Sequence, residues 1–183
     1  MKRGTNHLLD IVVRYFILII VGILNNWIFY LFFTSLTIYP VYFLLNIFFD
    51  ASLSSNFIII NRSLPIEIIG ACVAGSAYYL LLILNLSTPQ IKLEKRIGIL
   101  LFSFLILLAV NILRIFLLSI MLVLGLSFFD VAHKIFWYVG SVVFVVLIWF
   151  GSVKLFKIKE IPFYSDIKVL LSNLRKIKSF KKN

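Results

Sequence analysis

The feature that most constrains this sequence is the apolar stretch at residues 97–124, in which Arg114 carries the one charge. A helix needs roughly 20 apolar residues to cross the hydrocarbon core of a bilayer, so this stretch is longer than a crossing requires. A guanidinium at membrane depth costs about 2.5–3.5 kcal/mol on insertion scales. Such a residue is retained where the protein or a ligand needs its charge. The sequence therefore predicts a membrane helix that carries a functional or ion-pairing arginine.

The composition predicts an all-α integral membrane protein. Of the 183 residues, 62% are hydrophobic and only 14% are charged, and the mean hydropathy is +1.09. Soluble domains average about 45–50% apolar and about 25% charged residues. The formal net charge of +11 arises mostly outside the apolar segments. This distribution favours membrane topology and anionic lipid headgroups as its explanation, and it argues against nucleic-acid binding.

Hydropathy and length together predict a compact bundle of about four transmembrane helices. The expected spans are residues 15–36, 66–86, 97–124 and 134–156. A shorter apolar segment, 41–49, follows Tyr39-Pro40 and is expected to be re-entrant or interfacial, because it is too short to cross comfortably. The connector at 50–65 is more polar, and within it Phe57-Ile58-Ile59-Ile60 favours a β-strand.

The distribution of basic residues predicts the orientation. The N-terminus, the loop at 92–96 and the tail are basic, whereas the 50–65 connector and the 125–130 turn are not. Under the positive-inside rule, the basic segments and both termini face the cytoplasm of a plasma membrane. We expect one transmembrane domain, 1–156, and a basic cytoplasmic tail, 157–183, that forms an amphipathic helix against anionic lipid headgroups.

Three chemically reactive residue types lie on successive predicted spans. Cys72 is the one cysteine of the chain, Arg114 has Asn111 one helical turn before it, and His133 begins the last span. In the predicted topology all three approach the extracytoplasmic leaflet. A cysteine thiolate is a nucleophile, a nearby cation favours that form, and a histidine can move the proton. An arginine can stabilise a tetrahedral oxyanion, so the set predicts a candidate catalytic site.

Two further residues are expected to support this site. Gly75 belongs to a stripe of small residues that permits another helix to approach closely. Asp130 is placed to cap the last span, because its carboxylate can accept the free N–H groups of the first turn. One cysteine and one well-placed histidine do not supply a set of metal ligands, so neither a metal nor another cofactor is expected.

Structural roles remain open for each of these residues. A lone cysteine in an apolar helix is commonly a small hydrophobic residue, and a histidine at a helix start is commonly interfacial. For Arg114 the alternative is an ion pair with Glu67 or Asp130, the nearest carboxylates, which are both expected near the outer interface. The corresponding function is a non-catalytic membrane assembly factor or transporter subunit in which Arg114 holds the bundle together.

At these residues the chain resembles the exosortase/archaeosortase family of membrane cysteine transpeptidases, as a short variant. The resemblance rests on Ile68-Ile69-Gly70-Ala71-Cys72-Val73-Ala74-Gly75, on Asn111-Ile112-Leu113-Arg114-Ile115 and on His133, and it covers about half of the chain, residues 63–145. The family usually has Ser or Thr and then Gly directly after the cysteine, whereas Val73-Ala74 stand here. The chain also lacks the additional N-terminal spans of longer members.

The resemblance implies that Cys72 is the nucleophile and that Arg114 and His133 are its partners. It implies a protease that cleaves a C-terminal sorting signal, consisting of a short motif, an apolar helix and a basic end, from exported proteins. The new carboxyl end would be transferred to a membrane lipid or a cell-surface acceptor. A protease that hydrolyses the same bond without transfer would use the same residues.

Overall fold

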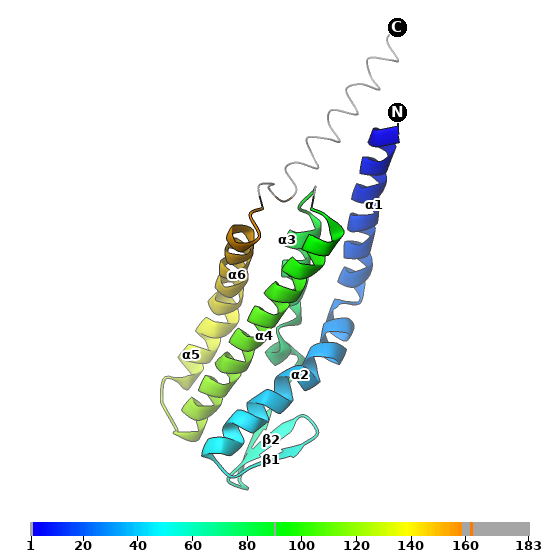
Figure 1. The fold of residues 1–183 in the computed structure, drawn as a ribbon. Helices are drawn as coiled ribbons and strands as arrows, with labels where there is room; N and C mark the ends of the chain where they lie inside the picture. Colours follow the sequence, from blue (N-terminus) through cyan, green and yellow to red (C-terminus); the bar gives the residue numbers. More distant parts are fainter. Residues whose placement is uncertain (1, 90, 159–161, 163–183) are drawn as a thin grey trace.

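The computed structural model describes residues 2–89, 91–158 and 162. Most of them are helical, and the sequence order of the elements is helices, a small sheet, then helices again (Figure 1). The helices are α1 (Lys2–Ile23), α2 (Asn25–Phe48), α3 (Gly75–Leu86), α4 (Leu93–Val123), α5 (Phe129–Ile135) and α6 (Ser141–Leu155). A 3-10 turn (Gly70–Val73) precedes α3, and a π-helical turn (Phe136–Gly140) joins α5 to α6.

Three of the described helices are long and apolar enough to cross a membrane. They are Phe29–Phe48 within α2, Leu93–Val123, which is α4, and Phe129–Leu155, which combines α5, the π turn and α6. Less than a third of the most apolar window of each helix is buried inside the molecule. Apolar side chains therefore cover the outer surface, as expected for a protein that lipid surrounds. The predicted spans at 97–124 and 134–156 are confirmed as apolar helices of sufficient length.

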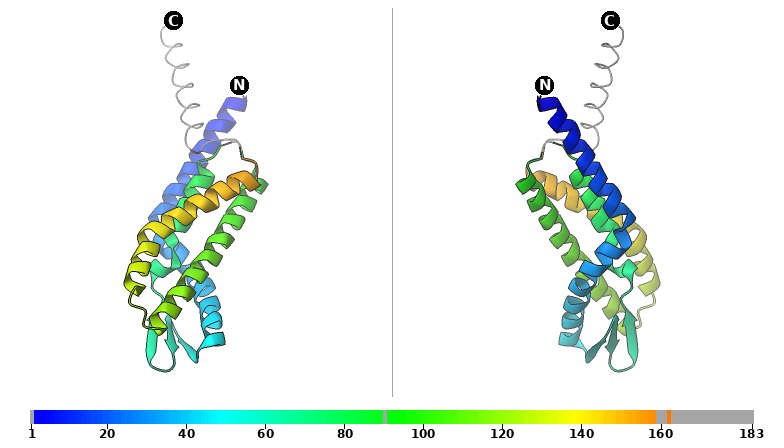
Figure 2. Two further views of the ribbon diagram at one scale, coloured as in Figure 1. Left: turned by 90° about the vertical axis from the view of Figure 1, so that its left-hand side faces the viewer. Right: turned by 90° about the vertical axis from the view of Figure 1, so that its right-hand side faces the viewer.

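The helices lead back and forth along the long dimension of the molecule, and α3, with 12 residues, covers only part of it (Figure 1). α1 and α2 together run from the N-terminal end to the sheet, and α3 returns (Figure 1). α4 then runs back to the sheet end, and α5 with α6 returns once more, so that the end of α6 lies away from the sheet (Figures 1 and 2). The helices pack with their long axes roughly along the molecule. This arrangement gathers the 50–65 connector and the 125–130 turn at one end.

The predicted break at Tyr39-Pro40 is wrong, and so is the separate re-entrant segment at 41–49. α2 continues through Pro40 to Phe48. Proline inside a helix costs about 3 kcal/mol. Val41 and Leu45 are completely buried in this part of α2, and burying such side chains contributes about 1.5–3 kcal/mol each. Their burial offsets the cost of the proline, so the helix continues.

The prediction of an all-α chain is also corrected, because a three-stranded antiparallel sheet follows α2. Its strands are β1 (Ala51–Ser54), β2 (Phe57–Ile60) and β3 (Leu64–Glu67), in the order β1-β2-β3. The β-strand predicted at Phe57–Ile60 is confirmed as β2, with Ile58 and Ile60 fully buried. Two Ile side chains on one face of a strand anchor the sheet against the helices.

The predicted span at 66–86 begins too early. Residues up to Glu67 belong to β3, and α3 itself begins only at Gly75 and has 12 residues. At about 1.5 Å per residue, such a helix covers only part of a bilayer core. The glycines and the Ala74 conformation described below interrupt what the hydropathy alone presents as one continuous span.

Two apolar clusters form the described core. The central cluster joins α2, α3, α4 and α6, and its members include Phe29, Tyr78, Leu107 and Trp149. The sheet-side cluster joins α2, the sheet and α4, and its buried members are Ile38, Val41, Leu45, Ala51, Ile58, Ile60, Ile68 and Ile115. The 3-10 turn lies where these clusters meet. The predicted amphipathic helix of the tail lies outside the described residues, apart from its beginning at Lys157.

Candidate functional site

The candidate site is built around the 3-10 turn Gly70–Val73 and the first residues of α3. Ala74 joins the two elements with φ 60° and ψ 35°, the left-handed conformation that glycine adopts more easily. A non-glycine residue in this conformation costs about 1–3 kcal/mol and persists where its surroundings fix it. At Gly75, a Cβ atom would lie 3.4 Å from the Cβ of Phe29, so the small residue permits close packing of α3 on α2.

Two side chains of α4 hold the 3-10 turn. The Nδ2 atom of Asn111 donates a hydrogen bond of 2.8 Å to the Cys72 carbonyl, and the Nη2 atom of Arg114 donates one of 3.3 Å to the same oxygen. Asn111 is 3% exposed. The Nε atom of Arg114 is buried and has no hydrogen-bond partner among the described residues. The guanidinium is therefore only partly satisfied by the protein.

A cavity of about 600 Å³ lies beside Arg114. Small residues of the turn and of α3 form one wall, and larger side chains of α2, of the π turn and of α6 form the rest. The residues that line it are Tyr30, Gly70, Ala71, Val73, Ala74, Gly75, Ser76, Ala77, Leu80, Arg114, Trp137, Ser141, Val142 and Val145. Leu80, Trp137 and Val142 are exposed on the outer surface. The rim of the cavity is thus largely apolar, with a cation inside.

Cys72 lies at this site, but its side chain does not line the cavity. The half-buried thiol packs against the sheet-side cluster. It is close enough to Arg114 and to Glu67 for their charges to act on it. The sequence predicted that Cys72 and Arg114 meet, and the structure brings them together. It does so through the Cys72 carbonyl, with the thiol on the sheet side of the turn.

His133 is connected to the site by Trp137, which contacts the His133 ring and lines the cavity. Its ring stacks on Phe129, with centroids 5.6 Å apart, and meets Trp137 edge to face at 6.0 Å. Trp137 in turn lines the cavity. Among the described residues, no hydrogen bond or ion pair joins His133 to Cys72 or Arg114. The structure therefore places His133 one side chain away from the cavity.

Asp130 does not cap the last helix in the predicted way. α5 begins at Phe129 with Phe128 at the capping position, and no side chain makes a capping hydrogen bond there. Asp130 is instead an exposed residue of the first turn. Its carboxylate still lies at the positive end of the helix dipole. The helix starts earlier than predicted, and this shift moves Asp130 from the cap into the helix.

Neither predicted ion pair of Arg114 is present in the described part of the chain. The described carboxylates that form ion pairs are Asp10, with Arg14, and Asp50, with Arg62. Across residues 2–89 and 91–158, there is also no group of three or more His, Cys, Asp or Glu side chains that could hold a metal ion.

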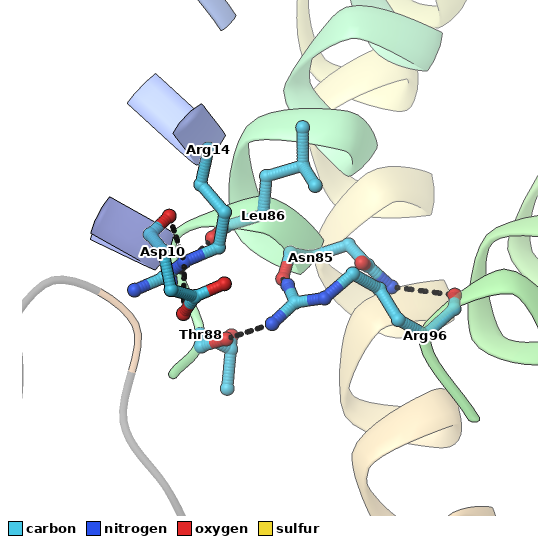
Figure 3. Close-up of polar contacts among 6 residues, drawn as sticks. All are labelled: Asp10, Arg14, Asn85, Leu86, Thr88 and Arg96. Carbon is cyan, nitrogen blue, oxygen red and sulfur yellow. Dashed lines mark hydrogen bonds and ion pairs between the residues drawn. The ribbon is translucent and has the colours of Figure 1, made fainter. Parts of the chain in front are cut away.

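A second polar cluster, at the C-terminal end of α3, was not predicted from the sequence (Figure 3). Arg96 donates from Nη1 to the Asn85 carbonyl and from Nη2 to the Thr88 carbonyl, the latter at 2.9 Å. Arg14 donates to the Leu86 carbonyl at 2.8 Å and pairs with Asp10. Both arginines are more than nine-tenths buried. In the sequence, both arginines lie beside the end of an apolar segment. This position indicated the orientation in the membrane but not the contacts with backbone carbonyls.

Comparisons with protein-family models, with curated proteins and with solved structures find no match to this chain.

Proposed function

We propose that this protein is a membrane-embedded cysteine transpeptidase that cleaves a C-terminal sorting signal and transfers the new C-terminus to an acceptor. The observation that carries the proposal is the unpartnered Nε of Arg114, buried beside a cavity and next to the only cysteine. A buried charge without full pairing inside the protein is costly, and residues of this kind gather at functional sites in membranes. A substrate oxyanion would complete the pairing of the guanidinium.

In the first step of the proposed reaction, His133 accepts the proton of the Cys72 thiol, and the thiolate attacks the scissile carbonyl carbon. The carbonyl oxygen becomes an oxyanion, which the Arg114 guanidinium stabilises. The C–N bond then breaks, and the leaving amine takes the proton from His133. A thioester between Cys72 and the new C-terminus remains.

In the second step, a hydroxyl or amine of the acceptor attacks the thioester carbon. His133 accepts the proton of this nucleophile, and the Cys72 thiolate leaves and is protonated again. The reaction requires the thiol to turn from the sheet-side cluster toward the cavity. A change of the Cys72 side-chain rotamer, or a shift of the 3-10 turn that carries it, brings the thiol to the cavity, and the His133 ring must also turn past Trp137 to meet it.

The proposed orientation follows the charges at the two ends of the molecule. Lys92 in the α3–α4 loop and Lys95 in the first turn of α4 lie at the end of the molecule opposite the sheet. Toward the sheet the described basic residues are fewer, with Arg62 between β2 and β3 and Lys134 in α5. By the positive-inside rule, the termini face the cytoplasm and the site faces the extracytoplasmic leaflet of the plasma membrane. This is the side on which exported proteins are processed.

The proposed substrates are exported proteins with a short C-terminal motif, an apolar helix and a basic end. The apolar rim of the cavity, with Trp137 and Val142 exposed, suits a substrate that approaches from within the bilayer. The acceptor is a membrane lipid or a cell-surface component. The basic tail would contact anionic lipid headgroups.

The intact mass of a co-expressed candidate substrate tests this proposal, with Cys72→Ala as the comparison. A shortened substrate with an added lipid or glycan mass, absent with Cys72→Ala, is the expected result. Shortening without an addition would identify a hydrolytic protease. A substrate that is processed equally by wild type and by Cys72→Ala would contradict the proposal.

A second candidate function has one observation in its favour. Asn111 and Arg114 both bind the Cys72 carbonyl, so Arg114 also ties the 3-10 turn to α4. In a non-catalytic assembly factor or transporter subunit, Arg114 would have only this structural role. Arg114→Ala would then lower stability, while Cys72→Ala and His133→Ala would leave function intact in a growth or assembly assay.

A further inference from the structure

We propose that Asn111 is a positioning residue that holds the Cys72 turn and so releases Arg114 for the substrate; this inference rests on the proposed function. The two α4 side chains share one acceptor but bind it differently. The Asn111 bond, at 2.8 Å, lies within the usual range, whereas the Arg114 bond, at 3.3 Å, lies just beyond it. The longer bond is the weaker of the two and is the one that a substrate can replace.

The environment of Asn111 suits a fixed role. The residue is 3% exposed, and its side chain reaches from α4 to the 3-10 turn, where the amide nitrogen donates at 2.8 Å to the Cys72 carbonyl. A buried carbonyl that loses its last donor costs about 1–3 kcal/mol. While Asn111 remains in place, the Cys72 carbonyl keeps a donor when Arg114 moves to an oxyanion.

Asn111 and Arg114 are the two side chains that donate to the Cys72 carbonyl. Without Asn111, Arg114 alone would do so. The guanidinium would then serve two acceptors in competition, and the turn that carries the nucleophile would be less well fixed. A displacement of about 1 Å in a catalytic group can lower a rate about 100-fold. Loss of the Asn111 amide should therefore lower kcat more than it raises KM.

The test is a series at position 111 in the full-length protein, assayed on the co-expressed or purified substrate. Asn111→Leu, which has a similar size and no donor, should lower kcat about 10- to 100-fold and change KM less than threefold. Asn111→Gln, which keeps the amide, should recover at least part of this loss. Ser103→Ala is the matched control, because it removes a buried bond of 2.9 Å between α4 and α6 away from the site.

A double-mutant cycle with Arg114→Ala supplies a second readout. If Asn111 acts through Arg114, Asn111→Leu should lower kcat much less in the Arg114→Ala background than in the wild type. If Asn111→Leu does not fold, Asn111→Ser takes its place, since its hydroxyl is too short to reach the carbonyl and the same loss is expected.

Three outcomes overturn the inference. If Asn111→Leu or Asn111→Ser folds and keeps the wild-type kcat, Asn111 does not position the turn. Cys72-dependent processing would still be present in that case, so the proposed function would stand. Equal kcat loss in Asn111→Leu and Ser103→Ala would show a general packing effect. Absence of Cys72-dependent processing in the wild type would remove the proposed function and this inference together.

Discussion

The two ends of α3 both receive arginines from neighbouring helices, but they satisfy them differently. At the C-terminal end, Arg14 and Arg96 are 4% and 6% exposed and donate to the carbonyls of Leu86, Asn85 and Thr88. At the N-terminal end, Arg114 donates one long hydrogen bond, keeps an unpartnered Nε and faces a cavity.

The difference follows from the polarity of a helix. The last carbonyls of a helix lack partners within it, and the helix dipole is negative there, so cations are stabilised. The first turn has free N–H groups and a positive dipole, so a nearby guanidinium gains nothing from it. The arginines at the C-terminal end complete a structural cap. Arg114 instead adds positive charge to the positive end of α3, which favours an anionic or oxyanionic ligand in the cavity.

The largest expected effect is the loss of kcat when Arg114, at the N-terminal end of α3, is replaced. Arg114→Ala removes the proposed oxyanion donor and should lower kcat about 100- to 1000-fold. Arg114→Lys keeps the positive charge, so its kcat should lie between those of Arg114→Ala and the wild type. Single-turnover processing of the substrate, measured in detergent or liposomes, checks this. Loss of thermal stability in parallel with loss of activity would point to the structural reading of Arg114 instead.

The next effect concerns the cap at the other end. Arg96→Ala leaves the Asn85 and Thr88 carbonyls without these donors, and the free energy of unfolding should fall by about 2–4 kcal/mol. Denaturation in mixed detergent micelles measures this quantity. The folded fraction should process substrate at the wild-type rate. If Arg96→Ala were as stable as the wild type, the arginines at the C-terminal end of α3 would not form a structural cap.

A smaller effect is expected at the joint between the 3-10 turn and α3. Ala74→Gly relieves a left-handed conformation and should raise the free energy of unfolding by about 0.5–1 kcal/mol. Position 74 is also where the resembled family usually has glycine. The same denaturation assay checks the prediction, and a lower stability than wild type would show that Ala74 packing outweighs its backbone strain.

The smallest effect belongs to an exposed arginine that serves as the reference. Arg62 is 90% exposed and pairs with Asp50 at 3.4 Å on the sheet end. Exposed ion pairs contribute about 0–1 kcal/mol, so Arg62→Ala should change neither stability nor processing by a measurable amount. A large loss of processing in this variant would relocate the functional surface to the sheet.

The sequence predicted the apolar helices at 97–124 and 134–156 well, because their signal is local. α4 was expected at 97–124 and is observed at Leu93–Val123, since nearly every residue of the stretch apart from Asn111 and Arg114 is apolar. The predicted span at 15–36 is wrong, because α1 ends at Ile23 and α2 begins at Asn25 and continues to Phe48. The helix through Pro40 and the short α3 were predicted wrongly. Both depend on contacts between distant segments, such as Val41 in the sheet-side cluster, and a hydropathy window does not contain those contacts.

The candidate site was predictable in its residue types and only partly in its geometry. An unpaired arginine, a single cysteine and a nearby asparagine stand out in an apolar sequence. The donor role of Asn111 toward the Cys72 carbonyl depends on a backbone acceptor, and any residue type supplies one. The capping roles of Arg14 and Arg96 were missed for the same reason, because their partners are carbonyls of α3 and its end.

The most direct measurement of the central claim is the intact mass of the protein itself after brief incubation with a candidate substrate and an acid quench. We expect a covalent adduct with the mass of the substrate's N-terminal portion, attached at Cys72 and released by hydroxylamine. It should be absent in Cys72→Ala, and it should form more slowly in His133→Ala, because His133 is proposed to take the thiol proton before attack. Efficient substrate processing by a wild-type protein that never carries this thioester would exclude Cys72 as the nucleophile.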